Sequence, residues 1–99
     1  MYLVRDIMYC KPGKVRSMVD KFKALNKVVT KMGLGEMRIL TDISAERYWT
    51  VVAEFEVKNL DEYAGMSAKT MEDKSLQKAM KGYHDLIDQG RREIYQIEV

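Results

Sequence analysis

The sequence contains one cysteine, one histidine and one proline, and no long apolar run. A single cysteine, Cys10, excludes a disulfide within the chain and gives no sign of an oxidising compartment. A single histidine, His84, excludes a metal site built on two histidines of one chain, and we expect no metal and no cofactor. No segment approaches the roughly 20 apolar residues of a membrane span, and the first ten residues lack the basic start of a secretory signal. We therefore expect no membrane partner and a cytoplasmic location.

The length of 99 residues predicts one domain, residues 1–99. The net charge of +2 gives the whole chain little attraction to polyanions. A domain of this length buries only ~60–65% of the surface of its unfolded chain, so its stability margin is small. Additional burial against a partner would increase that margin, which favours self-association.

Apolar periodicity divides the chain into six elements. A period of two residues with β-branched and aromatic side chains predicts strands, and a spacing of three or four predicts helices. Gly33 follows the last apolar residue of the first helix, and Asn59 with Glu62 has the spacing of a capping box at the start of the second. The expected elements are a strand at 2–10, a helix at 15–32, strands at 37–43 and 48–57, a helix from Asn59 to Gly90 that is interrupted near 72–75 and restarts at a Ser75 cap, and a strand at 94–99.

The order β-α-β-β-α-β predicts the ferredoxin-like α+β fold, a four-stranded antiparallel sheet with two helices on one face. The other face of the sheet is then uncovered, and its mixture of apolar and charged side chains is too apolar for full exposure to water. Pairing with the same face of a second copy is the simplest way to cover it. The residues expected at this dimer face are Arg5, Leu40, Tyr48, Val52 and Glu54.

Three parts of the chain resemble NIPSNAP-like members of the dimeric α/β-barrel superfamily. They are KPGK at 11–14 before a helix, LTDI at 40–43 leading into YWTVV at 48–52, and YHDLI at 83–87 followed by GRREIY at 90–95. One departure is Ala45-Glu46, at a hairpin turn where the resemblance predicts a glycine. The resemblance implies a homodimer in which two four-stranded sheets form a barrel, with a pocket between each sheet and its own helices.

The superfamily includes cofactor-independent monooxygenases that oxidise aromatic polyketides or quinols, haem-degrading enzymes, lactone isomerases and many proteins without known activity. The fold therefore does not identify a reaction. The resemblance places Asp6, Phe55 and Met80 where haem-degrading members carry asparagine, tryptophan and histidine, and these differences argue against haem chemistry.

The residues suited to a pocket lie where the sheet should face the helices. Asp6 interrupts an apolar strand, and it is either paired in a salt bridge or exposed at a strand edge, or it is a base in a pocket. His84 is either a residue at a helix boundary or an acid or base that faces a pocket. No catalytic residue is assigned, and Asp6, Tyr83 and His84 are the polar candidates. The apolar ligand-pocket candidates, which also suit a packed core, are Trp49, Ala53, Phe55 and Met80.

Residues 11–31 carry seven basic side chains and one acidic side chain, which fits either a solvated helix face or a nucleic-acid site. The RNA-recognition fold has the same element order, but its third strand presents stacking aromatics in a glycine-containing motif. Here Tyr48 takes the place of the glycine and Glu54 that of an aromatic residue, so we expect no nucleic-acid partner.

The sequence thus predicts a small homodimeric α/β-barrel protein, a small-molecule-binding or structural domain without identifiable catalytic residues. The expected ligand is apolar. The alternative is a cofactor-independent monooxygenase, or a related enzyme, that acts on an apolar or aromatic small molecule.

Overall fold

The structure is a computed structural model that describes residues 1–33 and 35–99. Its strands pair in the order β2-β3-β1-β4, and every neighbouring pair is antiparallel. This sheet with its helices is the ferredoxin-like α+β arrangement that the sequence predicts. The elements are β1 (Tyr2–Cys10), α1 (Val15–Lys31), β2 (Arg38–Thr41), β3 (Thr50–Val57), α2 (Leu60–Glu72), α3 (Lys74–Ala79), the 3-10 helix η1 (Tyr83–Leu86) and β4 (Ile87–Gln96).

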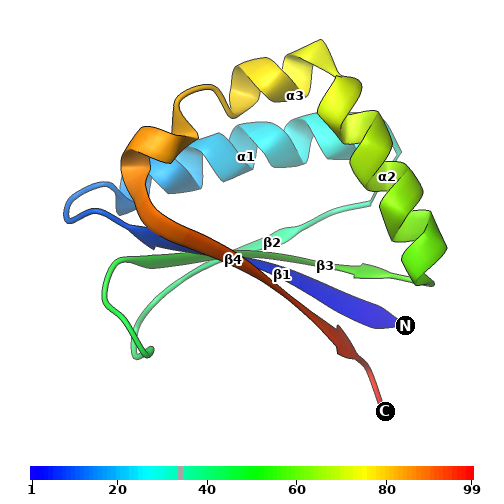
Figure 1. Cartoon of the computed structure of the whole chain (residues 1–99), viewed down its shortest axis with the longest axis horizontal. Helices are drawn as coiled ribbons and strands as arrows, with labels where there is room; N and C mark the ends of the chain where they lie inside the picture. The colour runs from blue at the N-terminus through cyan, green and yellow to red at the C-terminus, as the bar shows by residue number, and fades with distance from the viewer. Residues whose placement is uncertain (34) are drawn as a thin grey trace.

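The helices lie on one face of the sheet. Figure 1 shows α1, α2 and α3 above the strands, while within the described part of the chain no helix lies on the opposite face. The two central strands, β1 and β3, run through the middle of the sheet, and the shorter β2 and the long β4 form its edges.

The core lies between α1 and the two central strands. Apolar residues three or four positions apart put Met18, Phe22 and Val29 on one side of α1, where they are buried. Val51 and Ala53 of β3 belong to the same buried cluster. Met18 and Val51 are both 0% exposed, so this contact between helix and sheet is fully dry.

By contrast, α2 buries none of its residues. In Figure 1 it rises at a steep angle from the end of β3 instead of lying flat on the sheet. Its first turn is capped as expected, because the side-chain oxygen of Asn59 accepts a hydrogen bond from the Glu62 amide at 2.6 Å. The helix thus begins for local reasons, and burial against the sheet contributes little to it.

The predicted interruption of the second helix is confirmed, but Asp73 caps the restart and not Ser75. The backbone of Asp73 is extended, and its carboxylate accepts a hydrogen bond from the Leu76 amide at 2.9 Å. Aspartate is a strong N-cap because its short side chain reaches the free amides of the next turn.

The end of the chain differs from the prediction. The helix from 74 ends at Ala79, Gly82 takes a left-handed φ of 82°, and the last strand starts at Ile87 rather than 94. Gly90, expected to end the helix, lies inside β4 opposite Met8. A Cβ atom at Gly90 would lie 3.0 Å from the Met8 sulfur, so the glycine permits close packing on β1. The strand pairing overrides the local helical pattern.

The burial of α1 predicts a large stability effect for one methionine and a small effect for another. Met18→Ala should lower the free energy of unfolding by about 2–5 kcal/mol, because it leaves a cavity in a dry core. Met71→Ala, at a side chain of α2 that is 72% exposed, should change it by less than about 0.5 kcal/mol. Urea denaturation followed by circular dichroism measures both, and equal effects would contradict this description of the core.

Candidate functional site

A cavity of about 410 Å³ lies between the sheet and the three helices. It exists because α1 covers only part of the sheet and α2 stands away from the rest. Most of its wall is apolar, and flexible methionine side chains contribute much of it, which suits ligands of variable shape. The methionines of the wall are Met8, Met37, Met66, Met71 and Met80.

One ion pair interrupts this apolar wall. Asp6 of β1 and Arg92 of β4 are direct cross-strand neighbours, and both line the cavity. The Arg92 Nε donates a hydrogen bond to the Asp6 carboxylate at 2.6 Å, and this bond raises the pKa of Arg92 above its ordinary value. Of the two interpretations of Asp6 from the sequence, the structure shows the salt bridge.

Two aromatic rings tie α2 to this part of the sheet. The Tyr63 ring of α2 lies 6.0 Å from the Phe55 ring of β3, centroid to centroid. The guanidinium carbon of Arg92 lies 5.6 Å from the Tyr63 centroid, within the range of a cation–π contact. Burial raises the pKa of the Tyr63 hydroxyl, and Arg92 partly opposes that shift. This contact holds α2 near its N-terminal end and leaves its C-terminal half over the cavity.

The three polar candidates from the sequence lie close together. A second hollow of about 320 Å³ shares Asp6, Met8, Tyr83 and Arg92 with the first, and His84 lines it as well. The Tyr83 and His84 rings are 3.9 Å apart between centroids with an interplanar angle of 33°. Tyr83 therefore stands between the two hollows, and His84 faces only the smaller one. A role for either residue in binding stays a prediction.

The four apolar candidates are divided. Phe55 and Met80 line the larger cavity, whereas Trp49 and Ala53 do not. Ala53 is 1% exposed and packed in the core. Trp49 precedes β3, has a left-handed φ of 63° and is 44% exposed. The strand predicted at 48–57 would put Trp49 on the same face as Phe55, and this is wrong because the strand, and with it the alternation of side chains between faces, begins only at Thr50.

The sequence pattern predicts neither Arg92 nor the part of α2 at 66–71 as part of the site. It places no strand at residues 87–93, so it does not identify Arg92 as the antiparallel partner of Asp6. The signal was an acidic residue inside one strand and a basic residue inside a segment that could pair with it. No pattern in the sequence distinguishes a helix that covers a cavity from one that fills it.

The described residues contain no group of three or more His, Cys, Asp or Glu side chains placed to hold a metal ion. Among the described helices, none combines the length and the apolar character needed to cross a membrane.

No family model matches the sequence, and no curated protein matches it significantly. Solved structures do match. An uncharacterized NIPSNAP domain protein from Burkholderia xenovorans superposes with a TM-score of 0.84 at 13% identity, over 100% of this chain and 96% of that one. A NIPSNAP family protein of unknown function from Agrobacterium tumefaciens gives a TM-score of 0.82 at 18% identity, over 98% of this chain and 87% of that one. The chain has the fold of NIPSNAP proteins.

A candidate antibiotic biosynthesis monooxygenase from Nitrosomonas europaea also matches, with a TM-score of 0.73 at 16% identity over 100% of both chains. The resemblance to NIPSNAP-like dimeric α/β-barrel proteins is thus confirmed at the level of fold. At these identities the likeness carries the arrangement of helices and strands, and it assigns no chemistry to this chain.

Cys10, at the end of β1, is a structural residue in this arrangement. It is 4% exposed and belongs to the core cluster under α1. Burial raises the pKa of its thiol above the ordinary value, and the negative charges of Asp42 and Asp88 add to the shift. The neutral thiol is therefore the stable form in the folded state.

We expect Cys10 to resist alkylation by iodoacetamide at pH 8.5 in the native protein and to react on unfolding in urea, because the thiolate is the reactive form. Folding raises the pKa of the Cys10 thiol, so the protonated thiol contributes to the free energy of unfolding. This contribution is fully present below the ordinary pKa of the thiol and is lost as the pH rises through the raised pKa. Mass spectrometry measures the alkylation, with Cys10→Ala as the unlabelled control. Rapid native labelling would contradict the burial.

Proposed function

We propose that the chain is a homodimeric small-molecule-binding domain whose ligand is apolar or aromatic and lies between the sheet and the helices. The observation that supports the proposal is the methionine-lined cavity of about 410 Å³, which has the size of a small-molecule site. A structural domain without a ligand would be expected to pack its helices more completely on the sheet.

The Asp6–Arg92 pair is the main charged feature of the cavity wall. Because Asp6 neutralises much of the Arg92 charge, the pair does not call for an anionic ligand. An Arg92 side chain that is about half exposed can still donate a hydrogen bond to an oxygen of an otherwise apolar molecule. This supports a ligand with a carbonyl or hydroxyl at one end and a hydrocarbon or aromatic body.

A cofactor-independent monooxygenase is the alternative function, and the candidate antibiotic biosynthesis monooxygenase of Nitrosomonas europaea has the same fold. The geometry does not favour catalysis over binding, since Asp6, the obvious base, is held in the ion pair. Oxygen consumption with aromatic substrates would separate the two functions.

Two variants of α2 test the cavity. Ser67 lines it, and the neighbouring Ala68 is exposed and does not. Ser67→Phe should fill the space and weaken binding of the neutral fluorescent probe N-phenyl-1-naphthylamine by about tenfold or more, a loss of about 1.4 kcal/mol. Ala68→Phe should leave binding unchanged. Fluorescence titration measures both, and equal binding by the two variants would remove the cavity from the proposal.

The homodimer is proposed from the uncovered sheet face. Ile7, Tyr9 and Val52 form a second cluster there, opposite the side packed on α1. Leu40 is 39% exposed beside Val52. Arg5 and Glu54, expected at the dimer face, lie on the same uncovered face, whereas Tyr48 lies in the loop before β3 and is 87% exposed. The cluster itself is only 6–9% exposed in the single chain, and it is the exposed Leu40 beside it, on a sheet face that no helix of the described residues covers, that supports an interface with a second copy.

Replacement of one exposed leucine should separate the protomers. Leu40→Arg puts a charge inside the proposed interface, on the edge strand β2, and should raise the dimer dissociation constant by about tenfold or more. Leu60→Arg, at another exposed leucine at the start of α2 (47% against 39% for Leu40), is the matched control and should leave the dimer intact. Sedimentation equilibrium distinguishes the 11.5 kDa chain from a species of twice that mass. A monomeric parent at tens of micromolar would falsify the homodimer.

No nucleic acid is part of the proposal. The sheet face that an RNA-recognition fold would use carries Glu54, Glu56 and Glu93, and acidic side chains repel phosphate. We keep the cytoplasm as the proposed location.

A further inference from the structure

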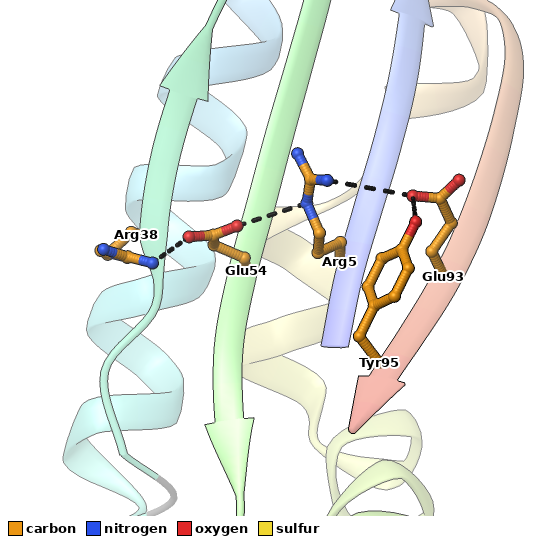
Figure 2. A network of polar contacts seen from close by, with 5 residues as sticks. All are labelled: Arg5, Arg38, Glu54, Glu93 and Tyr95. Carbon is orange, nitrogen blue, oxygen red and sulfur yellow. Dashed lines mark hydrogen bonds and ion pairs between the residues drawn. The ribbon is translucent and has the colours of Figure 1, made fainter. Parts of the chain in front are cut away.

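A row of charges crosses the uncovered face of the sheet from edge to edge. Arg38 of β2 pairs with Glu54 of β3, Glu54 with Arg5 of β1, and Arg5 with Glu93 of β4, each in direct cross-strand register. Figure 2 shows the four side chains side by side across the strands, with Tyr95 beside Glu93. We call Arg38, Glu54, Arg5 and Glu93 the charged row. Its signs alternate: plus, minus, plus, minus.

The row is held together within one chain. Arg38 forms an ion pair with Glu54, and the Arg5 Nε lies 3.3 Å from the other Glu54 oxygen. That nitrogen is buried without an aligned hydrogen bond, so its contact with Glu54 is electrostatic rather than directional. The Arg5 Nη1 lies 4.0 Å from Glu93, and the Tyr95 hydroxyl donates to Glu93 at 2.8 Å. Glu54 is nearly covered by its two arginines, while Arg5 and Glu93 remain partly exposed toward the open side.

Because the signs alternate, two copies of the charged row can place every charge opposite a charge of the other sign, but only in one relative orientation of the two sheets. If the two-fold axis of a face-to-face dimer runs along the strands, the order β2-β3-β1-β4 lies over β4-β1-β3-β2 of the second copy. Arg38 then faces Glu93, and Glu54 faces Arg5. If the axis instead runs across the strands along the row, every residue faces its own copy, and like charges meet. A sideways slip by one strand also puts like charges together.

We propose that the charged row sets the orientation and register of the homodimer, so that the two sheets pair with their strand order reversed and in full overlap. This inference rests on the homodimer proposed above. The partner is a second copy of this chain, recognised by the plus-minus-plus-minus row.

The neighbouring row fits the same orientation. Leu40, Val52, Ile7 and Arg91 follow one another across the strands, two residues along each strand from the charged row. With reversed strand order, Val52 faces Ile7 at the centre, so two apolar side chains that are 9% and 6% exposed in the single chain meet there, and Leu40 faces Arg91 at each edge. Because packed sheets twist relative to each other, the central strands approach most closely. The Glu54–Arg5 pairs of the charged row should therefore contribute more to selectivity than the pairs at its edges.

The sharpest test reverses every sign of the row. The variant Arg38→Glu, Glu54→Arg, Arg5→Glu, Glu93→Arg keeps alternation within the chain, and it remains complementary to itself. Against the parent, however, all facing pairs become like charges. Differently tagged parent and variant are mixed, unfolded and refolded together, and their dimers are counted by native mass spectrometry.

We expect both homodimers to form and the mixed dimer to fall about tenfold or more below its statistical share, because like charges facing across an interface are strongly unfavourable. A mixed dimer at the statistical share would show that the row has no part in pairing. A mixed dimer above its statistical share would show that each residue of the row faces the same residue of the second copy. Either result overturns the proposed orientation and leaves the homodimer standing. A monomeric parent would overturn both.

A second variant covers failure of the fourfold replacement to fold. Arg5→Glu with Glu54→Arg changes only the two central residues and preserves the ion pair between them, although it places like charges beside Arg38 and Glu93 at the edges of the row. Two copies of this variant place opposite charges face to face, whereas one copy of the variant and one of the parent place like charges face to face at the centre of the interface. We therefore expect the mixed dimer to be excluded here as well. The exchange Lys23→Glu with Asp20→Lys, on α1 away from the sheet, is the control and should mix freely with the parent.

Discussion

Packing of α1 on the two central strands is the contact on which the remaining structure depends. Met18 and Phe22 of the helix and Val51 of β3 are fully buried or nearly so, whereas α2 and β4 bury no residue completely. A chain of this size has room for one dry core, and this one lies to one side of the molecule. The space beneath α2 and the open face of the sheet are both consequences of that placement.

Cross-strand ion pairs on both faces of β1 mark the two regions that the core leaves unfilled. Asp6 points toward the helices and pairs with Arg92 at the cavity, while its neighbour Arg5 points to the open face and contacts Glu54 and Glu93. Adjacent residues of a strand face opposite sides, so one dipeptide provides a charged group to each. Each charge has a partner of opposite sign from a neighbouring strand, which reduces the cost of placing it in a partly buried position.

The binding proposal and the dimer proposal therefore concern opposite faces of one sheet. The cavity is lined by elements of a single chain, since its wall comes from the strands and their own helices. The charged row lies on the opposite face, which no helix of the described residues covers. Strand β1 contributes residues to both the cavity and the charged row, so a change in the pairing of this strand would alter both faces of the sheet. Neither proposal requires the other.

The sequence by itself determined the order of elements, the ferredoxin-like fold and the face assignment of β1 and of β3 from Thr50 onward. These features follow from local periodicity, which the spacing of apolar residues along α1 and the alternation around Asp6 express directly. Capping at Asn59 is equally local, because the acceptor and its amide are three residues apart. The polar pocket candidates followed from chemistry, since an acid inside an apolar strand needs a partner.

Tertiary structure decided what depends on residues far apart in the chain. The apolar stripe of the helical pattern continues to Ile87, yet the strand begins there because β1 offers an unpaired edge and Gly90 fits against Met8. The pairing of Asp6 with Arg92 and the joining of Arg38, Glu54, Arg5 and Glu93 into one row depend on that register. The cavity depends on the angle at which α2 leaves β3, which no local pattern encodes because it results from packing.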